Sequence, residues 1–174
     1  IVPAVSGTFS GWYLDSSSNA GSTSLSVNQN TTGQLVYKHY QGATINYLDA
    51  DNNDAVLTTI SVSGKQGATI DSDYSHNLQN LLDQGYVLAS SDYQTGATYD
   101  SDDNSDQTFT VKLVHGTTDS TETKTITRTI KVTNPDGSVT ITTQPVTLSR
   151  TVTTDQVTGN KTYSDWTSGE WEAY

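Results

Sequence analysis

Residues 72–85 form the one segment of this chain whose apolar residues recur with the period of a helix. Four apolar side chains fall on one face of that helix: Tyr74, Leu78, Leu81 and Leu82. Asp71 or Ser72 can cap its start, and Gly85 can end it in the left-handed conformation. Because a single helix with one apolar face needs a partner, we expect a sheet that packs against it.

The segments around this helix alternate in the manner of strands. Four strands are predicted, two before the helix and two after it, at residues 43–48, 56–63, 86–90 and 108–114. In the last of them, Phe109, Val111 and Leu113 are expected to point into the core. The order strand–strand–helix–strand–strand is that of a β-grasp, with its last strand beside its first. Residues 43–115 are therefore predicted to be a mainly β, α+β subdomain whose sheet has one covered face.

The remainder of the chain, residues 116–174, carries strand signals only. Predicted strands follow one another at residues 125–133, 139–143, 146–152, 160–166 and 170–174. The motif Asn134-Pro135-Asp136-Gly137 predicts a turn. Pro145 has no N–H to donate, and it is expected to interrupt the returning strand at a sheet edge or a bulge. With no helix to cover it, this part is predicted to be an elongated all-β subdomain.

Residues 1–42 alternate weakly, with Gly, Ser and Asn between the alternating pieces. We expect two to four strands there, either as the tail of a preceding module or as an extra layer on the next one. The charge distribution indicates a further boundary near Gly116, because residues 1–115 hold 12 acidic and 3 basic side chains and residues 116–174 hold 7 and 5. Three parts are therefore expected, at 1–42, 43–115 and 116–174.

The composition disfavours several functional classes. A net charge of −11 argues against nucleic-acid binding and against an anionic membrane surface. The absence of Cys leaves neither a disulfide framework nor a thiolate zinc site. No segment is apolar enough to predict a membrane span. A Thr-rich, acidic, Cys-free composition is typical of extracellular modules of Gram-positive surface proteins, so we expect an extracellular location.

No pattern of catalytic residues is present in the sequence. His39, His76 and His115 are far apart in the chain and have no metal-ligand spacing. There is no G-x-S-x-G nucleophile elbow and no phosphate-binding glycine loop. We therefore expect a protein that is not an enzyme and requires no cofactor.

Two acidic clusters could hold calcium. Asp49, Asp51 and Asn53 have the i, i+2, i+4 spacing of a calcium loop, without its later Gly and Glu. The second cluster lies in one loop and consists of Asp100, Asp102, Asp103 and Asp106. The alternative is that these side chains form turns and keep the surface soluble. The sequence leaves both interpretations open.

Three tryptophans lie in polar surroundings: Trp12, Trp166 and Trp171. Exposed aromatic rings stack on sugar rings, so these side chains are predicted contacts for a glycan ligand. The alternative is that they pack against the edge of a thin sheet.

Several motifs together resemble the mucin-binding (MucBP) domain. Residues 45–51 resemble its Tyr-x-Asp hairpin, the S-G-K-Q-G sequence at 63–67 its turn, residues 84–93 its Gly-Tyr-x-Leu strand, and residues 106–111 its closing strand. Further pieces resemble the companion subdomain of mucus-binding (Mub) repeats, at residues 127–130, 134–137, 148–151, 155–159 and 166. The resemblance covers about residues 43–174.

This resemblance implies a repeat of a large, cell-wall-anchored adhesin of lactic acid bacteria that attaches the cell to host mucin glycoproteins. It also implies that the first subdomain is ubiquitin-like, and it supplies no catalytic or ligand-binding residues. Three functions remain open for a monomeric repeat of this kind: binding mucin glycans, serving as a spacer, or binding immunoglobulin by strand addition to a sheet edge.

Overall fold

The computed structural model describes residues 9–18 and 33–174. These residues divide into two compact units. The first comprises the described residues up to Leu82 together with Val87–Val114, and the second comprises Asp83–Tyr86 together with His115–Tyr174. Strands predicted within 1–8 and 19–32 lie outside the described residues.

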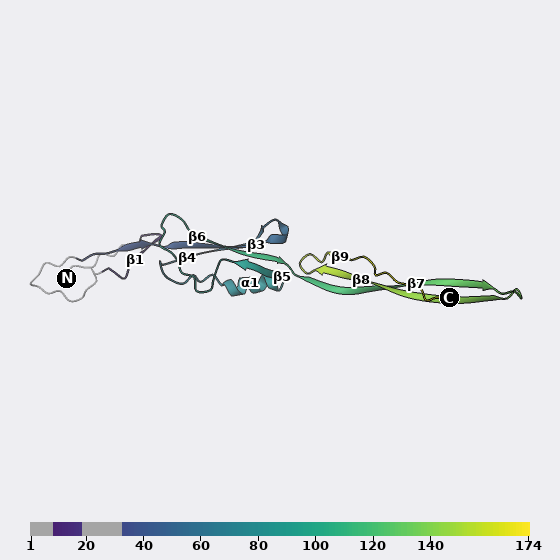
Figure 1. Cartoon of the computed structure of the whole chain (residues 1–174). Coiled ribbons are helices and arrows are strands. Elements are labelled where there is room, and N and C mark those ends of the chain that lie inside the picture. Colours follow the sequence, from purple (N-terminus) through teal and green to yellow (C-terminus); the bar gives the residue numbers. More distant parts are fainter. Residues whose placement is uncertain (1–8, 19–32) are drawn as a thin grey trace, which may run out of the picture. The chain divides into compact units, whose positions relative to one another are not determined.

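The first unit is built on a four-stranded sheet with the order β4-β3-β6-β5 (Figure 1). Its strands are β3 (Gln41–Asp49), β4 (Ala55–Gly64), β5 (Tyr86–Ser91) and β6 (Gln107–His115). Strands β3 and β4 form an antiparallel hairpin closed by the short helix η1 (Ala50–Asn52), whereas β3 and β6 are parallel neighbours. Helix α1 (Tyr74–Leu82) connects β4 to β5. This topology confirms the predicted β-grasp, including the last strand beside the first.

The core of the first unit lies between this sheet and α1. Burial alternates along β3, where Ala43, Ile45 and Tyr47 are fully buried. Val111 and Leu113 of β6 are buried on the same side, as the alternation of that strand predicted. From the helix, Leu81 is buried and the ring of Tyr74 stacks on Tyr47 with centroids 6.3 Å apart. A fully buried side chain of this size stabilises a fold by about 1.5–3 kcal/mol, so these few residues supply much of the unit's stability.

Residues in the left-handed conformation flank α1 on both sides, Asp73 before it and Gly85 after it. Gly85 follows the helix with φ +98°, as predicted, and an added Cβ would lie 2.7 Å from the carbonyl oxygen of Gln156. The predicted cap by Ser72 is wrong, because its hydroxyl is buried and has no hydrogen-bond partner. Asp73, with φ +51°, stands between Ser72 and the helix and directs the chain through a left-handed turn.

A small hairpin precedes the four-stranded sheet. Strands β1 (Trp12–Leu14) and β2 (Tyr37–His39) pair antiparallel, with Tyr13 opposite Lys38. The backbone N–H of Tyr40 donates to the carbonyl of Gly11, which extends the pairing to the start of β3. In the described part of residues 1–42, two of the expected strands are therefore present.

The second unit is dominated by one long hairpin. Strands β7 (Thr117–Thr133) and β8 (Val139–Asp155) pair antiparallel over 17 residues each, and β9 (Lys161–Tyr163) pairs with the end of β8 (Figure 1). At about 3.3 Å per residue, such a strand is roughly 55 Å long. The turn at 134–137 forms as predicted, with Gly137 at φ +84°. The elongated all-β subdomain is thus confirmed, although β7 begins eight residues before the predicted strand.

The predicted interruption at Pro145 is wrong, since β8 runs through it without a break. Pro145 lies opposite Thr127 in the register of the hairpin. Ser149 and Thr151, which have the same parity along β8, donate their N–H groups away from β7 to hydroxyls of the C-terminal segment. The missing N–H of Pro145 therefore falls on the side that β7 does not use. Residues 170–174, predicted as a strand, have no regular secondary structure.

Candidate functional site

The acidic loop before β6 is shaped by its own carboxylates. Asp102 accepts hydrogen bonds from the backbone N–H of Asn104 at 3.0 Å and from the hydroxyl of Ser105 at 2.8 Å. These contacts, with the Asn104 N–H contributing most, hold the pKa of Asp102 below its usual value. Asp100 accepts from the N–H of Asp102 at 3.2 Å. The loop is thus a succession of turns closed by Asp side chains.

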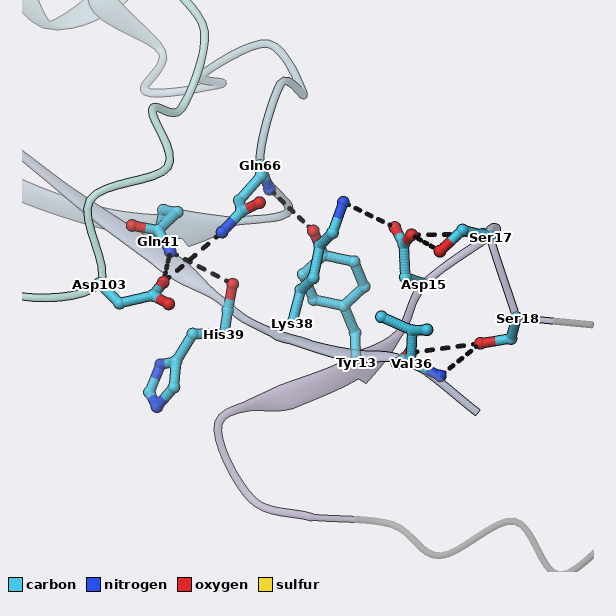
Figure 2. Close-up of polar contacts among 10 residues, drawn as sticks. All are labelled: Tyr13, Asp15, Ser17, Ser18, Val36, Lys38, His39, Gln41, Gln66 and Asp103. Atoms are coloured by element: carbon cyan, nitrogen blue, oxygen red, sulfur yellow. Dashed lines mark hydrogen bonds and ion pairs between the residues drawn. The ribbon is translucent and has the colours of Figure 1, made fainter. Parts of the chain in front are cut away.

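Asp103 and Asp106 attach this loop to the start of β3. The side-chain amide of Gln41 donates to Asp103 at 2.6 Å (Figure 2). A Cβ on Gly42 would lie 2.3 Å from the carboxylate of Asp106, so a larger residue at that position would require the Asp106 side chain to move. Sequence reasoning did not find these contacts, because Gln41 and Asp103 are separated by 62 residues.

The hairpin β1–β2 joins the same end of the first unit through polar contacts (Figure 2). The phenol oxygen of Tyr13 accepts the backbone N–H of Gln66 at 3.2 Å. Lys38 and Asp15 form an ion pair at 3.2 Å within the hairpin. The hairpin that carries Trp12 is thereby attached to the residues that follow β4.

A groove of about 410 Å³ lies between β2, the start of β3 and the acidic loop. It is lined by His39, Tyr40, Gln41, Asp102, Asp103, Asn104, Ser105 and Asp106. Trp12 stands beside it, with its ring centroid 4.4 Å from that of His39 in an edge-on arrangement. The groove therefore brings together three of the predicted acidic residues, and Trp12 contacts His39 of its wall.

The other acidic cluster is located at the tip of the β3–β4 hairpin. Asp49 is only 3% exposed, and its carboxylate caps η1 by accepting the N–H of Asp51 at 3.0 Å. Asn53 adopts φ +54°, a conformation that Asn tolerates well. Asp51 and Asn53 are exposed. The spacing that resembles a calcium loop is used here to form a tight connection.

Within residues 9–18 and 33–174, no three Asp, Glu or His side chains converge on one point as metal ligands do. Calcium binding by Asp49, Asp51 and Asn53, or by the four acidic residues of the loop, stays a prediction. The hydrogen bonds described above favour the turn-forming alternative for Asp49 and Asp102.

The two tryptophans of the second unit lie against cations. The ammonium of Lys124 is 4.2 Å from the centroid of the Trp166 ring, and the guanidinium of Arg150 is 4.6 Å from the same ring. Arg128 lies 5.5 Å from the ring of Trp171. All three cations share one face of the β7–β8 hairpin, where the C-terminal segment covers them. Cation–π contacts of this kind stabilise packing, and both rings are half-buried.

One further polar pair escaped the sequence analysis. Nδ1 of His115 lies 2.6 Å from the carboxylate of Asp155 within the second unit. The pKa of Asp155 is strongly lowered, mostly by this contact and next by the hydrogen bond from the N–H of Thr158. The two residues are 40 positions apart, so no spacing rule could have paired them. Their role is structural, because they close the base of the hairpin.

The two units match known families separately and in order. Residues 41–115 match the mucin binding domain family, and residues 117–174 match the Muc B2-like domain family. Both units of the chain thus resemble mucus-binding repeats. No curated protein is similar enough in sequence to be counted as a relative.

Solved repeats of mucus-binding proteins have the same fold. This repeat is 25% identical to the type 2 repeat of the mucus binding protein MUB from Lactobacillus reuteri, with a TM-score of 0.54 over 74% of this chain and 76% of that one. It is 29% identical to Mub-RV, with a TM-score of 0.60 over 73% of this chain and 72% of the other.

Mucus-binding repeat families are non-enzymatic adhesion modules of extracellular cell-surface proteins, and the similarity supports an adhesin-type repeat here. Across the described part of the chain, no helix is both long and apolar enough to cross a membrane.

Proposed function

We propose that this repeat binds mucin glycoproteins and, as one monomeric copy within a longer wall-anchored protein, attaches its cell to mucus. The observation that carries the proposal is the match of both units, in the order of a mucus-binding repeat, to the mucin binding and Muc B2-like families. The structural neighbours are themselves repeats of mucus-binding proteins.

A glycan would meet a shallow polar surface with an aromatic ring at its border. Trp12 is 43% exposed and stands beside the groove at the acidic loop, so its ring is accessible for stacking on a sugar. Trp166 and Trp171 have part of their rings against Lys and Arg side chains, which favours packing as their main role. We therefore place Trp12 first among the proposed glycan contacts.

The test is retention on immobilised mucin. A single shallow site binds weakly, and strength comes from many copies acting together. We expect beads that display many copies of the 174-residue repeat to be retained on mucin, and single copies to wash off. Beads of the same density carrying a β-grasp protein of unrelated sequence are the control. Equal loss of both bead types at every density would rule out the proposal.

The same family allows a spacer role, in which the repeat extends the adhesive part of the protein away from the wall. The 17-residue strands of the second unit favour this alternative. A full-length adhesin from which all domains except the repeats have been deleted distinguishes mucin binding by the repeats from a spacer role. Retention of such a protein on mucin supports binding by the repeats.

Immunoglobulin binding by strand addition is a second candidate function, and one observation favours it. Strand β7 is the edge of its sheet among the described strands, and its first eleven residues are exposed. An extended partner could pair with this edge. Replacing Thr123 by Pro removes an N–H from the outward side of β7, so it should abolish such pairing without disturbing the bonds to β8. A sensor surface carrying immunoglobulin measures the difference.

A further inference from the structure

A second cavity lies at the start of α1, away from the groove beside Trp12. Its volume is about 490 Å³, within the range of small-ligand sites. Its walls come from two segments: residues 69–75 before and into the helix, and Tyr93, Thr95 and Gly96 after β5. None of the motifs discussed above uses this cavity.

Hydrogen bonds hold the two walls together. The N–H of Ile70 donates to the carbonyl of Ala97 at 2.8 Å, and the hydroxyl of Tyr93 donates to the carbonyl of Ile70 at 3.0 Å. The rings of Tyr74 and Tyr93, which both line the cavity, contact each other with centroids 4.8 Å apart. A ligand would therefore meet a surface that is already formed, which reduces the entropy lost on binding.

One buried hydroxyl without a partner, that of Ser72, lies at this cavity. Among the described side chains, only Tyr47 and Ser72 bury a polar atom that makes no hydrogen bond. Ser72 lines the cavity and is 5% exposed. Tyr47 stacks behind Tyr74. A buried unpaired hydroxyl is costly to a fold, and its retention at a cavity indicates a place where a ligand completes the bonding.

The chemistry of the lining selects the ligand. Half-buried Tyr74 provides aromatic surface, backed by buried Tyr93, and Asp71 and Asp73 provide carboxylates that accept hydrogen bonds from hydroxyl groups. Thr69, Ser72, Ser75 and Thr95 add hydroxyls. No Lys or Arg lines the cavity, and two carboxylates repel an anion.

We propose that the cavity at the start of α1 is a subsite for an uncharged sugar residue of a mucin glycan, and that it discriminates against sialylated and sulfated sugars. This rests on the proposed function and names the part of the repeat that would perform it. Stacking on Tyr74 would recognise the apolar face of the sugar ring, and Asp71 and Asp73 would accept hydrogen bonds from its hydroxyl groups.

The experiment uses the whole 174-residue chain and two variants. Ser75→Trp places a large side chain at the rim of the cavity from an exposed position on the first helical turn. Gln79→Trp places the same side chain one turn further along α1 and outside the cavity, so it is the matched control. Circular dichroism and thermal unfolding establish that both variants are folded.

Amide chemical shifts are followed by NMR during titration with galactose, N-acetylgalactosamine and N-acetylneuraminic acid. We expect the two neutral sugars to shift the amides of residues 69–75 and 93–96, with millimolar affinity, and the anionic sugar to leave them unchanged. Ser75→Trp should weaken the neutral sugars about tenfold or more, whereas Gln79→Trp should bind as the natural sequence does. Asp73→Asn, which removes the charge but keeps a residue suited to positive φ, should also weaken them.

Retention on mucin separates failure of the site from failure of the function. The subsite is supported if beads carrying many copies of Ser75→Trp lose retention on mucin while beads carrying Gln79→Trp keep it. The natural sequence should also be retained on mucin that has been treated with sialidase. Unchanged retention and sugar binding in Ser75→Trp would overturn the subsite and leave mucin binding standing. A natural sequence that is never retained on mucin would overturn both.

Discussion

His115 and Asp155 join the last residue of β6 to the last residue of β8 through a contact of 2.6 Å between Nδ1 and the carboxylate. Both belong to the second unit, where the N–H of Gly116 also donates to the carbonyl of Gly85. A long two-stranded hairpin has little core of its own, so contacts at its base have a large influence on its stability.

The first prediction concerns the stability of the second unit at acidic pH. Since the folded state lowers the pKa of Asp155, its ionised form stabilises the fold above the unfolded pKa of about 3.9, and this contribution disappears as the pH falls further. Asp155→Asn should therefore destabilise the second unit at pH 7 and have a smaller effect at pH 2–3. Urea unfolding across this pH range measures it. Asp165→Asn removes the same charge from an exposed position, and an equal response from both variants would contradict the role of the pair.

The second prediction concerns two buried tyrosines of the first unit, Tyr47 and Tyr93. Burial, and then the proximity of Tyr74, Tyr93 and Asp73, raises the pKa of Tyr47 to about 12. The free energy of unfolding should fall between about pH 10 and 12, because the unfolded chain releases this proton first. Tyr47→Phe should remove that loss and, by deleting an unpaired hydroxyl, leave stability at pH 7 unchanged or raised by about 1 kcal/mol.

Tyr93→Phe is the contrasting variant. Its hydroxyl donates to the carbonyl of Ile70, so the same deletion should cost about 1 kcal/mol at pH 7. Chemical denaturation of the two variants in parallel makes the comparison. Equal losses from Tyr47→Phe and Tyr93→Phe would show that the Tyr47 hydroxyl is satisfied in solution.

The third prediction concerns the helix. Leu81 is the most buried residue of α1, and Leu81→Ala should cost about 2–5 kcal/mol in the first unit. Leu78→Asp places a charge on the same half-buried face and should prevent the β-grasp from folding. Amide exchange by NMR reports on each unit separately. Folded Leu78→Asp protein with natural protection in β3 and β6 would contradict the assigned core.

The fourth prediction concerns the stacked cations of the second unit. The guanidinium of Arg150 lies 4.2 Å from the ring centroid of Tyr163, and its Nε donates to Glu122 at 2.7 Å. It also contacts Trp166, so Arg150→Ala should cost about 1–2 kcal/mol and shift the fluorescence of that tryptophan. Arg150→Lys should recover part of the loss, because an ammonium stacks less well. Lys131→Ala, on the opposite face of the hairpin, should leave the fluorescence unchanged.

The fifth prediction concerns calcium. Asp102 already accepts three hydrogen bonds from Asn104 and Ser105, so we expect the turn-forming role for the loop. The melting temperature should then be the same in millimolar calcium and in EDTA. A rise of several degrees with calcium, abolished by Asp102→Asn and Asp103→Asn, would instead establish the metal site.

The first unit was predictable because its signals are local. The helical period at residues 72–85 and the alternation in 108–114 identified the elements, and their order implied the parallel pairing of β3 with β6. The predicted Ser72 cap failed because a left-handed Asp73 intervenes, and no rule on capping residues anticipates that conformation.

The second unit was less predictable because the packed face of the β7–β8 hairpin is not apolar. Residues 117–124 of β7 lack hydrophobic alternation, so the strand was expected to start later. The face that packs against the C-terminal segment uses Lys124, Arg128 and Arg150 under aromatic rings, and a hydrophobic pattern does not detect such cations. The break expected at Pro145 failed because the direction of an N–H depends on register, which the sequence does not state.

The parallel pairing of β3 and β6 has a mechanical consequence for an adhesin. The chain enters the sheet at Gln41, at the start of β3, and leaves it at His115, at the end of β6. Tension along the polypeptide would slide these neighbours past each other and load their hydrogen bonds together, in shear, instead of opening them one at a time. Resistance to pulling depends on the rate of unfolding, so this arrangement suits a cell held against flowing mucus.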